Sequence, residues 1–320
     1  MIFFLANKIL KLLAKLSSKN KYEFASEMSD EDAVRNIGYL AHNLRKTARQ
    51  GAGVPLYPIK LAIKECHKIV LKKRKMGLKV YDFEEWIADN FRLLMGTLGS
   101  IDFNALAFVP HVDGVPRIVV LADFIVKYSV GKVTRDRAAR VLEAFNAVTP
   151  LGYNEIACLK DAVAYRLLVE ISFFAERSLH YFSSYLRARK KKFSFRDRRS
   201  DSYLTYYAEL HKDACVPGLD ESDFRAARLG LDNLLADNLL LTSSYVDSLR
   251  FLGGEFDESF IVSLSLTDRI YKREACYKQM SFAARHDYLI QTAKCAARNA
   301  VSEQSLARAA LELADALDVH

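Results

Sequence analysis

The amino-acid sequence predicts an all-α protein of about ten to twelve helices. The 320 residues include only 13 glycines and 6 prolines, so the chain has few places at which it must turn sharply. Hydrophobic residues make up 51% of the chain and charged residues 27%, a composition that supports a large folded core. Over most of the chain, apolar residues recur every three or four positions, which is the spacing of one helix face.

Residues 1–20 predict an amphipathic N-terminal helix. Lys8, Lys11 and Lys15 recur at helical spacing, and large apolar side chains cover the rest of the cylinder. Such a helix either lies in a membrane interface or docks on the protein core. No uninterrupted apolar run in the sequence is long enough to span a bilayer.

Helix start signals follow in a predicted first lobe, residues 21–186. Ser29 precedes a group of acids and starts a helix to about residue 47, because acids are favoured in a first helical turn. Pro58 suits the first turn of a helix that ends near residue 75. Asp82 is interpreted as the cap of the next helix.

The remainder of the first lobe contains its longest predicted element. Residues 100–116 hold several glycines and prolines and are interpreted as irregular, whereas 116–128 is interpreted as a helix despite its β-branched residues. Thr134 caps a further helix. Residues 153–187 contain neither glycine nor proline, and their apolar spacing predicts one long central helix of about 50 Å.

The second half repeats this pattern. We predict a second helical lobe at 201–320, joined to the first by a basic loop at 187–200. Glycine, proline and serine residues separate the predicted helices of this half, which cover 200–214, 220–252, 256–272, 279–299 and 302–316.

The net charge of +8 is concentrated in two short runs. Residues 187–200 hold eight basic residues and one acid, and residues 72–79 hold five basic residues and no acid, so the remaining chain is mildly acidic. Such clustering indicates a local contact with an anionic surface. The candidate contact residues are Arg187, Arg189, Lys190, Lys191, Lys192, Arg196, Arg198, Arg199, Lys72, Lys73, Arg74 and Lys75.

Three interpretations of these basic runs are compatible with the sequence. They are solvated segments without a partner, they contact the anionic cytosolic face of a membrane, or they bind RNA. RNA is the least favoured partner, because only Phe193 and Phe195 are interleaved with basic residues of the larger run as platforms for base stacking.

The sequence contains no recognisable catalytic motif. It has no phosphate-binding loop and no GxGxxG, HExxH or GxSxG pattern, and its seven histidines do not cluster. The five cysteines are scattered, which predicts a reducing cytosol and neither a disulfide framework nor a thiolate metal site. The acids of 84–89 and 255–258 resemble general acid/base pairs, but both groups lie at predicted helix starts, where acids stabilise the helix. We therefore predict no catalytic residue, cofactor or metal.

Several short segments match, in the same order, segments of one known family. Trp86–Phe91 is similar to that family's EWLLDNF, Gly114–Ile118 to GxPRV, and Leu264–Asp268 to VSLVD. The other matching segments are His42 with Gly51–Pro58, Val148–Leu151 with Glu155 and Arg166–Glu170, Asn238 with Ser248–Arg250, Met280–Arg285 with Tyr288, and Ser302–Ala314. Together they resemble the N-terminal helical region of bacterial cyclic β-1,2-glucan synthases.

The resemblance implies a supporting role beside a transferase. In that family the helical region precedes a membrane-embedded module that uses UDP-glucose, and no QxxRW-type motif or membrane span of such a module is found in this sequence. The resemblance therefore transfers no catalytic residue. It implies a non-catalytic cytoplasmic scaffold at the inner face of the inner membrane, whose partner is the membrane-embedded glucosyltransferase module of the same or an adjacent polypeptide.

Two other classes of function are also compatible with the sequence. The first is a free-standing helical adaptor that binds RNA or another protein through the basic runs. The second is an enzyme, either a transferase or a hydrolase, whose paired acids are brought together from distant parts of the chain.

Overall fold

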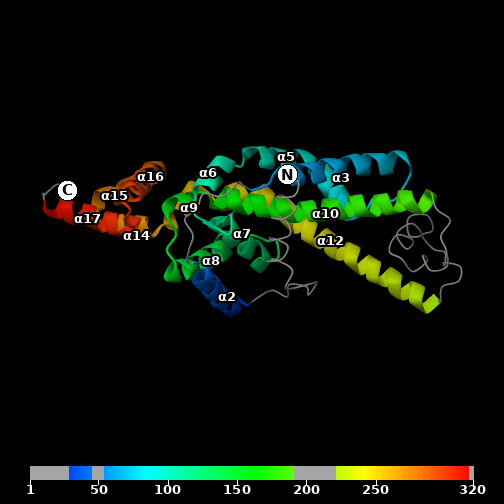
Figure 1. Ribbon diagram of the computed structural model, residues 1–320, viewed down its shortest axis with the longest axis horizontal. Helices are drawn as coiled ribbons and strands as arrows, with labels where there is room; N and C mark the ends of the chain where they lie inside the picture. The colour runs from blue at the N-terminus through cyan, green and yellow to red at the C-terminus, as the bar shows by residue number, and fades with distance from the viewer. Residues whose placement is uncertain (1–28, 45–53, 191–220, 317–320) are drawn as a thin grey trace. The chain divides into compact units, whose positions relative to one another are not determined.

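The computed structural model describes residues 29–44, 54–190 and 221–316 (Figure 1). Within these residues the chain forms fifteen helices and one two-stranded hairpin, which confirms the all-α prediction with a slightly higher helix count. The predicted helices at 1–20 and 200–214 lie outside the described residues.

The elements follow one another in this order along the described chain. The first helices are α2 (Asp30–Asn43), α3 (Tyr57–Lys75), α4 (Asp82–Asp89), α5 (Phe91–Ser100) and α6 (Phe103–Phe108). Strands β1 (His111–Val112) and β2 (Val115–Pro116) precede α7 (Arg117–Tyr128), α8 (Arg135–Val148), α9 (Tyr153–Ala157) and α10 (Leu159–Lys190). The last helices are α12 (Glu221–Glu255), α13 (Glu258–Ser263), α14 (Leu266–Tyr271), α15 (Ala275–Gln279), α16 (Phe282–Arg298) and α17 (Glu303–Ala316).

Most predicted helix starts are confirmed. The hydroxyls of Ser29 and Thr134 each accept the backbone N–H of the residue three positions later, at 3.2 and 3.4 Å, and so cap α2 and α8. Pro58 lies in the first turn of α3. The cap of α4 was predicted one residue too late, because Tyr81 holds the cap position and Asp82 is the first helical residue.

The predicted long helix at 153–187 is divided near its start. The N–H of Cys158 donates to the carbonyl of Glu155 at 3.1 Å, three residues earlier, so the chain closes a tight turn between α9 and α10. The carboxylate of Glu155 in turn accepts the N–H of Gly152, which fixes α9 as a separate turn of helix. The long helix therefore begins at Leu159 and continues to Lys190.

A hairpin occupies part of the segment that was interpreted as irregular. Val112 and Val115 pair across an antiparallel register, and the two residues between them, Asp113 and Gly114, have φ values of 51° and 80°. Two consecutive left-handed residues define a type I′ turn, for which Asp-Gly is a favoured sequence. The hairpin places β2 immediately before α7.

The chain forms two compact units, and each unit combines segments from both halves of the sequence. Among the described residues, the first unit contains 55–100, 167–190 and 221–247, and the second contains 29–44, 54, 101–166 and 248–316. These units do not follow the order of the predicted lobes, and most of the basic loop predicted between those lobes lies outside the described residues.

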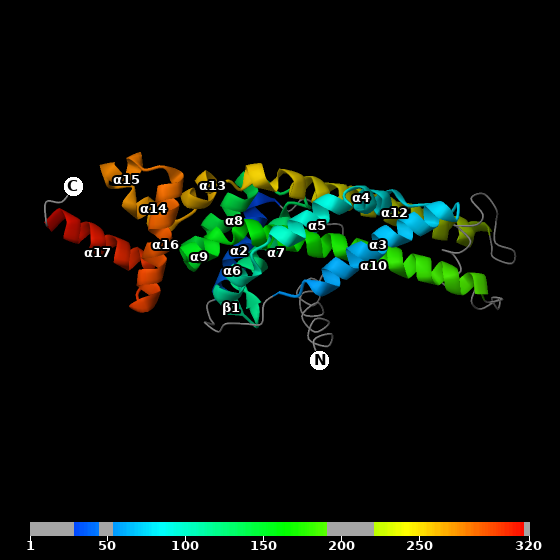
Figure 2. The same ribbon diagram turned by 90° about the horizontal axis from the view of Figure 1, so that it is seen from above.

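The first unit is built on the contacts among α3, α4 and α5. The buried face of α3 carries Ile59, Ile63, Cys66 and Val70, each at most 1% exposed. These residues recur every three or four positions and so lie on one face of the helix. The spacing therefore predicts which face of α3 packs on the core. Figure 2 shows α3 together with α4 and α5 from above.

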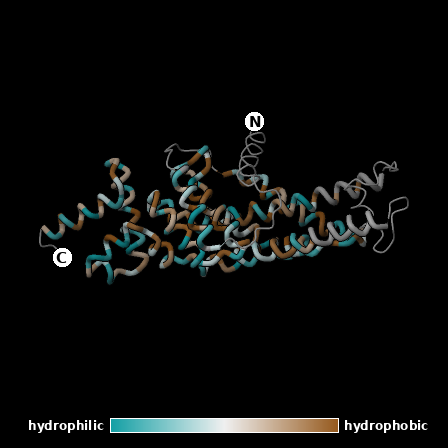
Figure 3. Tube along the Cα trace, turned by 90° about the horizontal axis from the view of Figure 1, so that it is seen from below, coloured by the Kyte–Doolittle hydropathy of each residue, from teal (hydrophilic) through white to brown (hydrophobic). Residues whose placement is uncertain are grey.

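The second unit has two buried regions. In one, α8 packs on α2 and α7, with Leu121, Ile125 and Phe145 fully buried. In the other, α14, α16 and α17 pack around Tyr271 and Leu289. Figure 3 shows hydrophobic and hydrophilic residues alternating along the described helices, as expected where each helix buries one face.

Candidate functional site

The basic residues predicted on α3 have different environments. Lys73 is only 1% exposed, and its Nζ atom lies 3.0 Å from Oε2 of Glu84. The guanidinium of Arg74 lies 3.6 Å from carboxylates of α4, whereas Lys72 and Lys75 are exposed. Lys73 is therefore removed from the predicted anionic-surface contact, because its ammonium group faces a buried carboxylate and not solvent.

The larger basic run falls mostly outside the described residues. Arg187, Arg189 and Lys190 lie in the last turn of α10. The other predicted contact residues of this run, Lys191, Lys192, Arg196, Arg198 and Arg199, are outside the described range, so their contact with an anionic surface stays a prediction.

The acidic groups singled out in the sequence are engaged in structural contacts. Asp257 caps α13 by accepting the N–H of Phe260 at 2.8 Å, and hydrogen bonds from Ser259 and Phe260 lower the pKa of the Asp257 carboxyl to about 2. A carboxylate of Glu255 accepts the N–H of Arg135 at 2.9 Å. The capping explanation is confirmed for Asp257, because its side chain performs that role.

A buried ionic cluster in the first unit joins α3, α4 and α10. The carboxylate of Glu84 contacts Lys73, accepts the hydroxyl of Ser178 at 2.6 Å, and accepts the N–H of Tyr81 at 3.0 Å. Burial, and then the charge of Glu84, raises the pKa of the adjacent Cys66 thiol to about 12. A thiol that remains protonated near neutral pH is a poor nucleophile, so this cluster is suited to structure and not to covalent catalysis.

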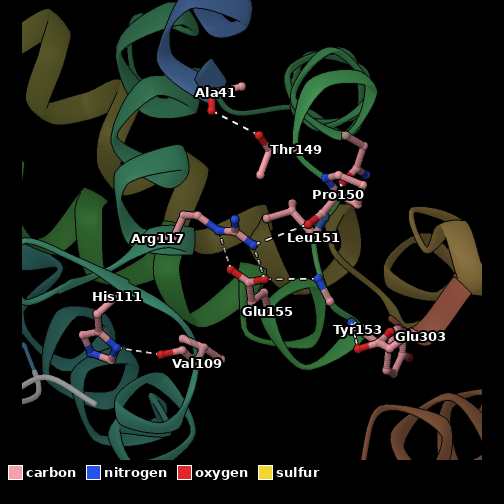
Figure 4. Close-up of polar contacts among 12 residues, drawn as sticks. Ala41, Val109, His111, Arg117, Thr149, Pro150, Leu151, Tyr153, Glu155 and Glu303 are labelled. Atoms are coloured by element: carbon pink, nitrogen blue, oxygen red, sulfur yellow. Dashed lines mark hydrogen bonds and ion pairs between the residues drawn. The ribbon is translucent and has the colours of Figure 1, made fainter. Parts of the chain in front are cut away.

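The second unit contains a comparable contact between α7 and α9, drawn in Figure 4. Nε and Nη2 of Arg117 donate to the two carboxylate oxygens of Glu155 at 2.9 and 2.6 Å, a bidentate geometry. Nη2 also reaches the carbonyl of Pro150 at 3.5 Å. Arg117 thereby connects the start of α7 to the turn that precedes α9.

A third contact connects α17 to the start of α9. The carboxylate of Glu303 accepts the N–H of Tyr153 at 3.0 Å (Figure 4). The hydroxyl of Thr267 in α14 donates to the same carboxylate at 3.5 Å. Burial is the main cause of the raised pKa of Glu303. The hydroxyl of Tyr153 contacts Nδ1 of His286 at 2.6 Å, so α16 joins the same group.

A buried carboxylate with several donors, Asp268, lies between α14 and α16. Asp268 is fully buried and accepts Nε of Arg285 at 2.9 Å, Nη2 of the same residue at 2.7 Å, and the hydroxyl of Tyr277 at 3.0 Å. Nζ of Lys272 lies 2.9 Å from Oδ2 of Asp268, the oxygen that also accepts Nη2 of Arg285 at 2.7 Å. Asp268 is therefore saturated with donors, which suits a structural anchor and leaves it poorly placed to exchange a proton with a substrate.

These buried pairs were missed by the sequence analysis. The signal for Lys73 was present, because it follows Val70 by three residues and so continues the apolar spacing of the buried face of α3. The partners of Arg117 and Glu303 lie 38 and 150 residues away in sequence, and no local pattern connects such positions.

Neither a metal-binding cluster nor a membrane-spanning helix is found among the described residues. No group of three or more His, Cys, Asp or Glu side chains within residues 29–44, 54–190 and 221–316 is arranged to hold a metal ion. Over the same part of the chain, none of the helices has the length and apolar character needed to cross a membrane.

We expect the cysteines to differ sharply in reactivity. Cys66 and Cys158 are buried, and burial raises the pKa of each thiol to about 12, whereas Cys276 and Cys295 are exposed. Alkylation with iodoacetamide near pH 8, followed by mass spectrometry, should modify the two exposed thiols first. In strong denaturant the four thiols should react at similar rates. Labelling of Cys66 in the native protein as fast as Cys276 would contradict this burial.

The fold and these contacts define an all-α protein whose helices are joined by buried ion pairs. No protein-family model matches the chain, and a comparison with curated proteins finds none of significant similarity.

Proposed function

We propose that the chain is a non-catalytic cytoplasmic scaffold region of a cyclic β-1,2-glucan synthase-like glycosyltransferase. The supporting observation is that polar residues of the resembling segments bond to one another. Arg117 belongs to the segment similar to GxPRV and bonds to Glu155 of the next segment. Asp268 of the segment similar to VSLVD bonds to Arg285 of the following one.

This pairing favours a structural role for the resembling segments. Glu303, from the last of them, accepts the N–H of Tyr153 and the hydroxyl of Thr267. Side chains that bond to other helices of the same unit hold those helices in place, whereas catalytic groups are expected to face a substrate. In this proposal, the glucosyltransferase module in the same or an adjacent polypeptide performs the chemistry at the inner face of the inner membrane.

The proposal is tested by co-expressing the tagged chain with the transferase module encoded beside it. We expect the module to co-purify with the chain from detergent-solubilised membranes, and glucan synthesis from UDP-glucose to fall when the chain is omitted. The chain alone should not turn over UDP-glucose. An intact chain that neither captures the module nor changes its synthesis would overturn the scaffold role, as would turnover of UDP-glucose by the chain alone.

A helical adaptor for RNA or protein is the second candidate. The exposed lysines of α3, among them Lys68, Lys72 and Lys75, favour a negatively charged partner of some kind. Nucleic acid that co-purifies with the chain and dissociates steeply with salt would favour this candidate.

A further inference from the structure

One face of α3 is exposed along the whole helix. On a helical wheel drawn at about 100° per residue, the residues of this face lie within about 60° on either side of the direction of Tyr57. We call it the α3 stripe, and its residues are Tyr57, Lys60, Leu61, Lys64, Lys68, Leu71, Lys72 and Lys75, all of them exposed. The stripe is about 27 Å long at 1.5 Å per residue.

The buried side of α3 determines that the stripe points outward. Ile59, Ile63 and Val70 are buried, and Lys73, which lies almost opposite Tyr57 on the helical wheel, is held inside by Glu84. Rotating α3 to cover the stripe would expose these apolar side chains and break the buried ion pair. The orientation of the stripe is therefore a property of the first unit's core.

The stripe combines positive charge with large apolar side chains. It holds five lysines and no acid, and the nearest acid along the helix, Glu65, lies at its edge and pairs with Lys68 at 2.6 Å. Tyr57, Leu61 and Leu71 are 63%, 37% and 45% exposed between those lysines. Exposed leucines cost hydration free energy unless a partner covers them, and lysines select a partner of negative charge.

These two properties fit the interface of an anionic lipid membrane. Lysine side chains can extend along the surface toward lipid headgroups while the leucines enter the boundary of the acyl chains, as in helices that lie flat on a bilayer. A single-stranded nucleic acid would instead be matched by several stacking aromatics, and Tyr57 is the one aromatic residue of the stripe.

We propose that the α3 stripe binds the surface of an anionic lipid membrane, with α3 parallel to the bilayer plane. This inference rests on the proposed scaffold role at the inner face of the inner membrane and names the surface that would contact that membrane. Of the run at 72–75 it keeps only Lys72 and Lys75, because Lys73 is buried and Arg74 faces α4. The contact is distributed along α3, from Lys60 to Lys75.

The test measures binding of the full chain to vesicles by sedimentation. One set of vesicles contains phosphatidylcholine with about a third phosphatidylserine, and the other contains phosphatidylcholine alone. The charge variant is Lys60→Gln with Lys64→Gln, and the apolar variant is Leu61→Gln with Leu71→Gln. The controls change exposed residues outside α3: Lys278→Gln with Lys294→Gln for the charge variant, and Leu240→Gln, at a side chain that is 65% exposed, for the apolar variant.

We expect the unchanged chain to bind only the anionic vesicles. The charge variant, which lacks two lysines, should bind about twenty-five-fold more weakly at low salt, since each basic residue near such a surface contributes about a factor of five. The apolar variant should bind about tenfold more weakly, and its deficit should persist at higher salt because apolar insertion is not screened. The control variants should bind as the unchanged chain does, and circular dichroism should show equal helix content in all of them.

The contrary outcomes separate the two proposals. Binding of the unchanged chain together with normal binding by both stripe variants would overturn the α3 stripe alone. No binding of the unchanged chain to anionic vesicles would overturn both the stripe and the proposed place of the chain at the inner face of the inner membrane. Vesicle binding through the stripe without capture of the transferase module would leave the stripe standing and overturn the scaffold role. Stripe variants that lose binding to a single-stranded RNA probe but keep vesicle binding would overturn lipid as the partner.

Discussion

Replacing Asp268 by alanine is expected to lower the free energy of unfolding of the second unit by about 3–5 kcal/mol. The carboxylate of Asp268 is fully buried and neutralises the guanidinium of Arg285, which is also buried. Without it, that guanidinium and the hydroxyl of Tyr277 would lose their acceptor in the interior. Removing one partner of a buried ion pair lowers the free energy of unfolding by more than the intact pair adds to it, because the remaining charge stays buried without water or a counter-charge.

The measurement is urea denaturation, followed by circular dichroism and by hydrogen exchange of the amides of α14 and α16. Asp287→Ala provides a matched control, because Asp287 is an exposed acid on α16 and its loss should change stability by less than about 0.5 kcal/mol. The double variant Asp268→Leu with Arg285→Met should be more stable than Asp268→Ala, since it leaves no unpaired charge in the interior and Lys272 is partly exposed. A loss below about 1 kcal/mol for Asp268→Ala would show that Arg285 finds another acceptor.

Helix boundaries were the part of the fold that local chemistry predicted best. The caps at Ser29 and Thr134 and the proline in the first turn of α3 were identified from single residues, because capping depends on atoms within three positions of the helix start. The hairpin at 111–116 was missed, since strands of two residues are too short to show an alternating pattern. Its remaining signal was the dipeptide Asp113-Gly114, which favours a type I′ turn.

The buried pairs could be predicted only in part. A run of four basic residues at 72–75 suggests a uniformly solvated patch when it is considered by composition alone. Helical phase divides the run, because the core face of α3 returns every three or four residues and reaches Lys73. The acceptor that makes this burial possible, Glu84, comes from α4 and cannot be inferred from the phase of α3.

Replacing Glu84 by alanine is expected to destabilise the first unit by about 3–5 kcal/mol. Glu84 is 0% exposed and is the carboxylate that neutralises the buried ammonium of Lys73. It also accepts the hydroxyl of Ser178 from α10 and the N–H of Tyr81 at the start of α4. In the variant, the ammonium group of Lys73, the hydroxyl of Ser178 and the N–H of Tyr81 therefore lose this buried acceptor. As at Asp268, the loss of stability arises because buried donors remain without a partner to replace water.

The adjacent position supplies the control for Glu84→Ala. Glu85 is 47% exposed and pairs only at long range with Arg74, at 3.6 Å, so Glu85→Ala should change stability by less than about 0.5 kcal/mol. The single tryptophan of the chain, Trp86, lies in α4 beside both residues, and its fluorescence during urea denaturation reports on this unit. Combining Lys73→Met with Glu84→Leu should recover part of the loss, because the ion pair is then replaced by apolar side chains of similar size. The hydroxyl of Ser178 and the N–H of Tyr81 still lose this acceptor, so recovery should be incomplete. Equal transitions for Glu84→Ala and Glu85→Ala would contradict the assignment of Lys73 and Glu84 as the pair that fixes the outward face of α3.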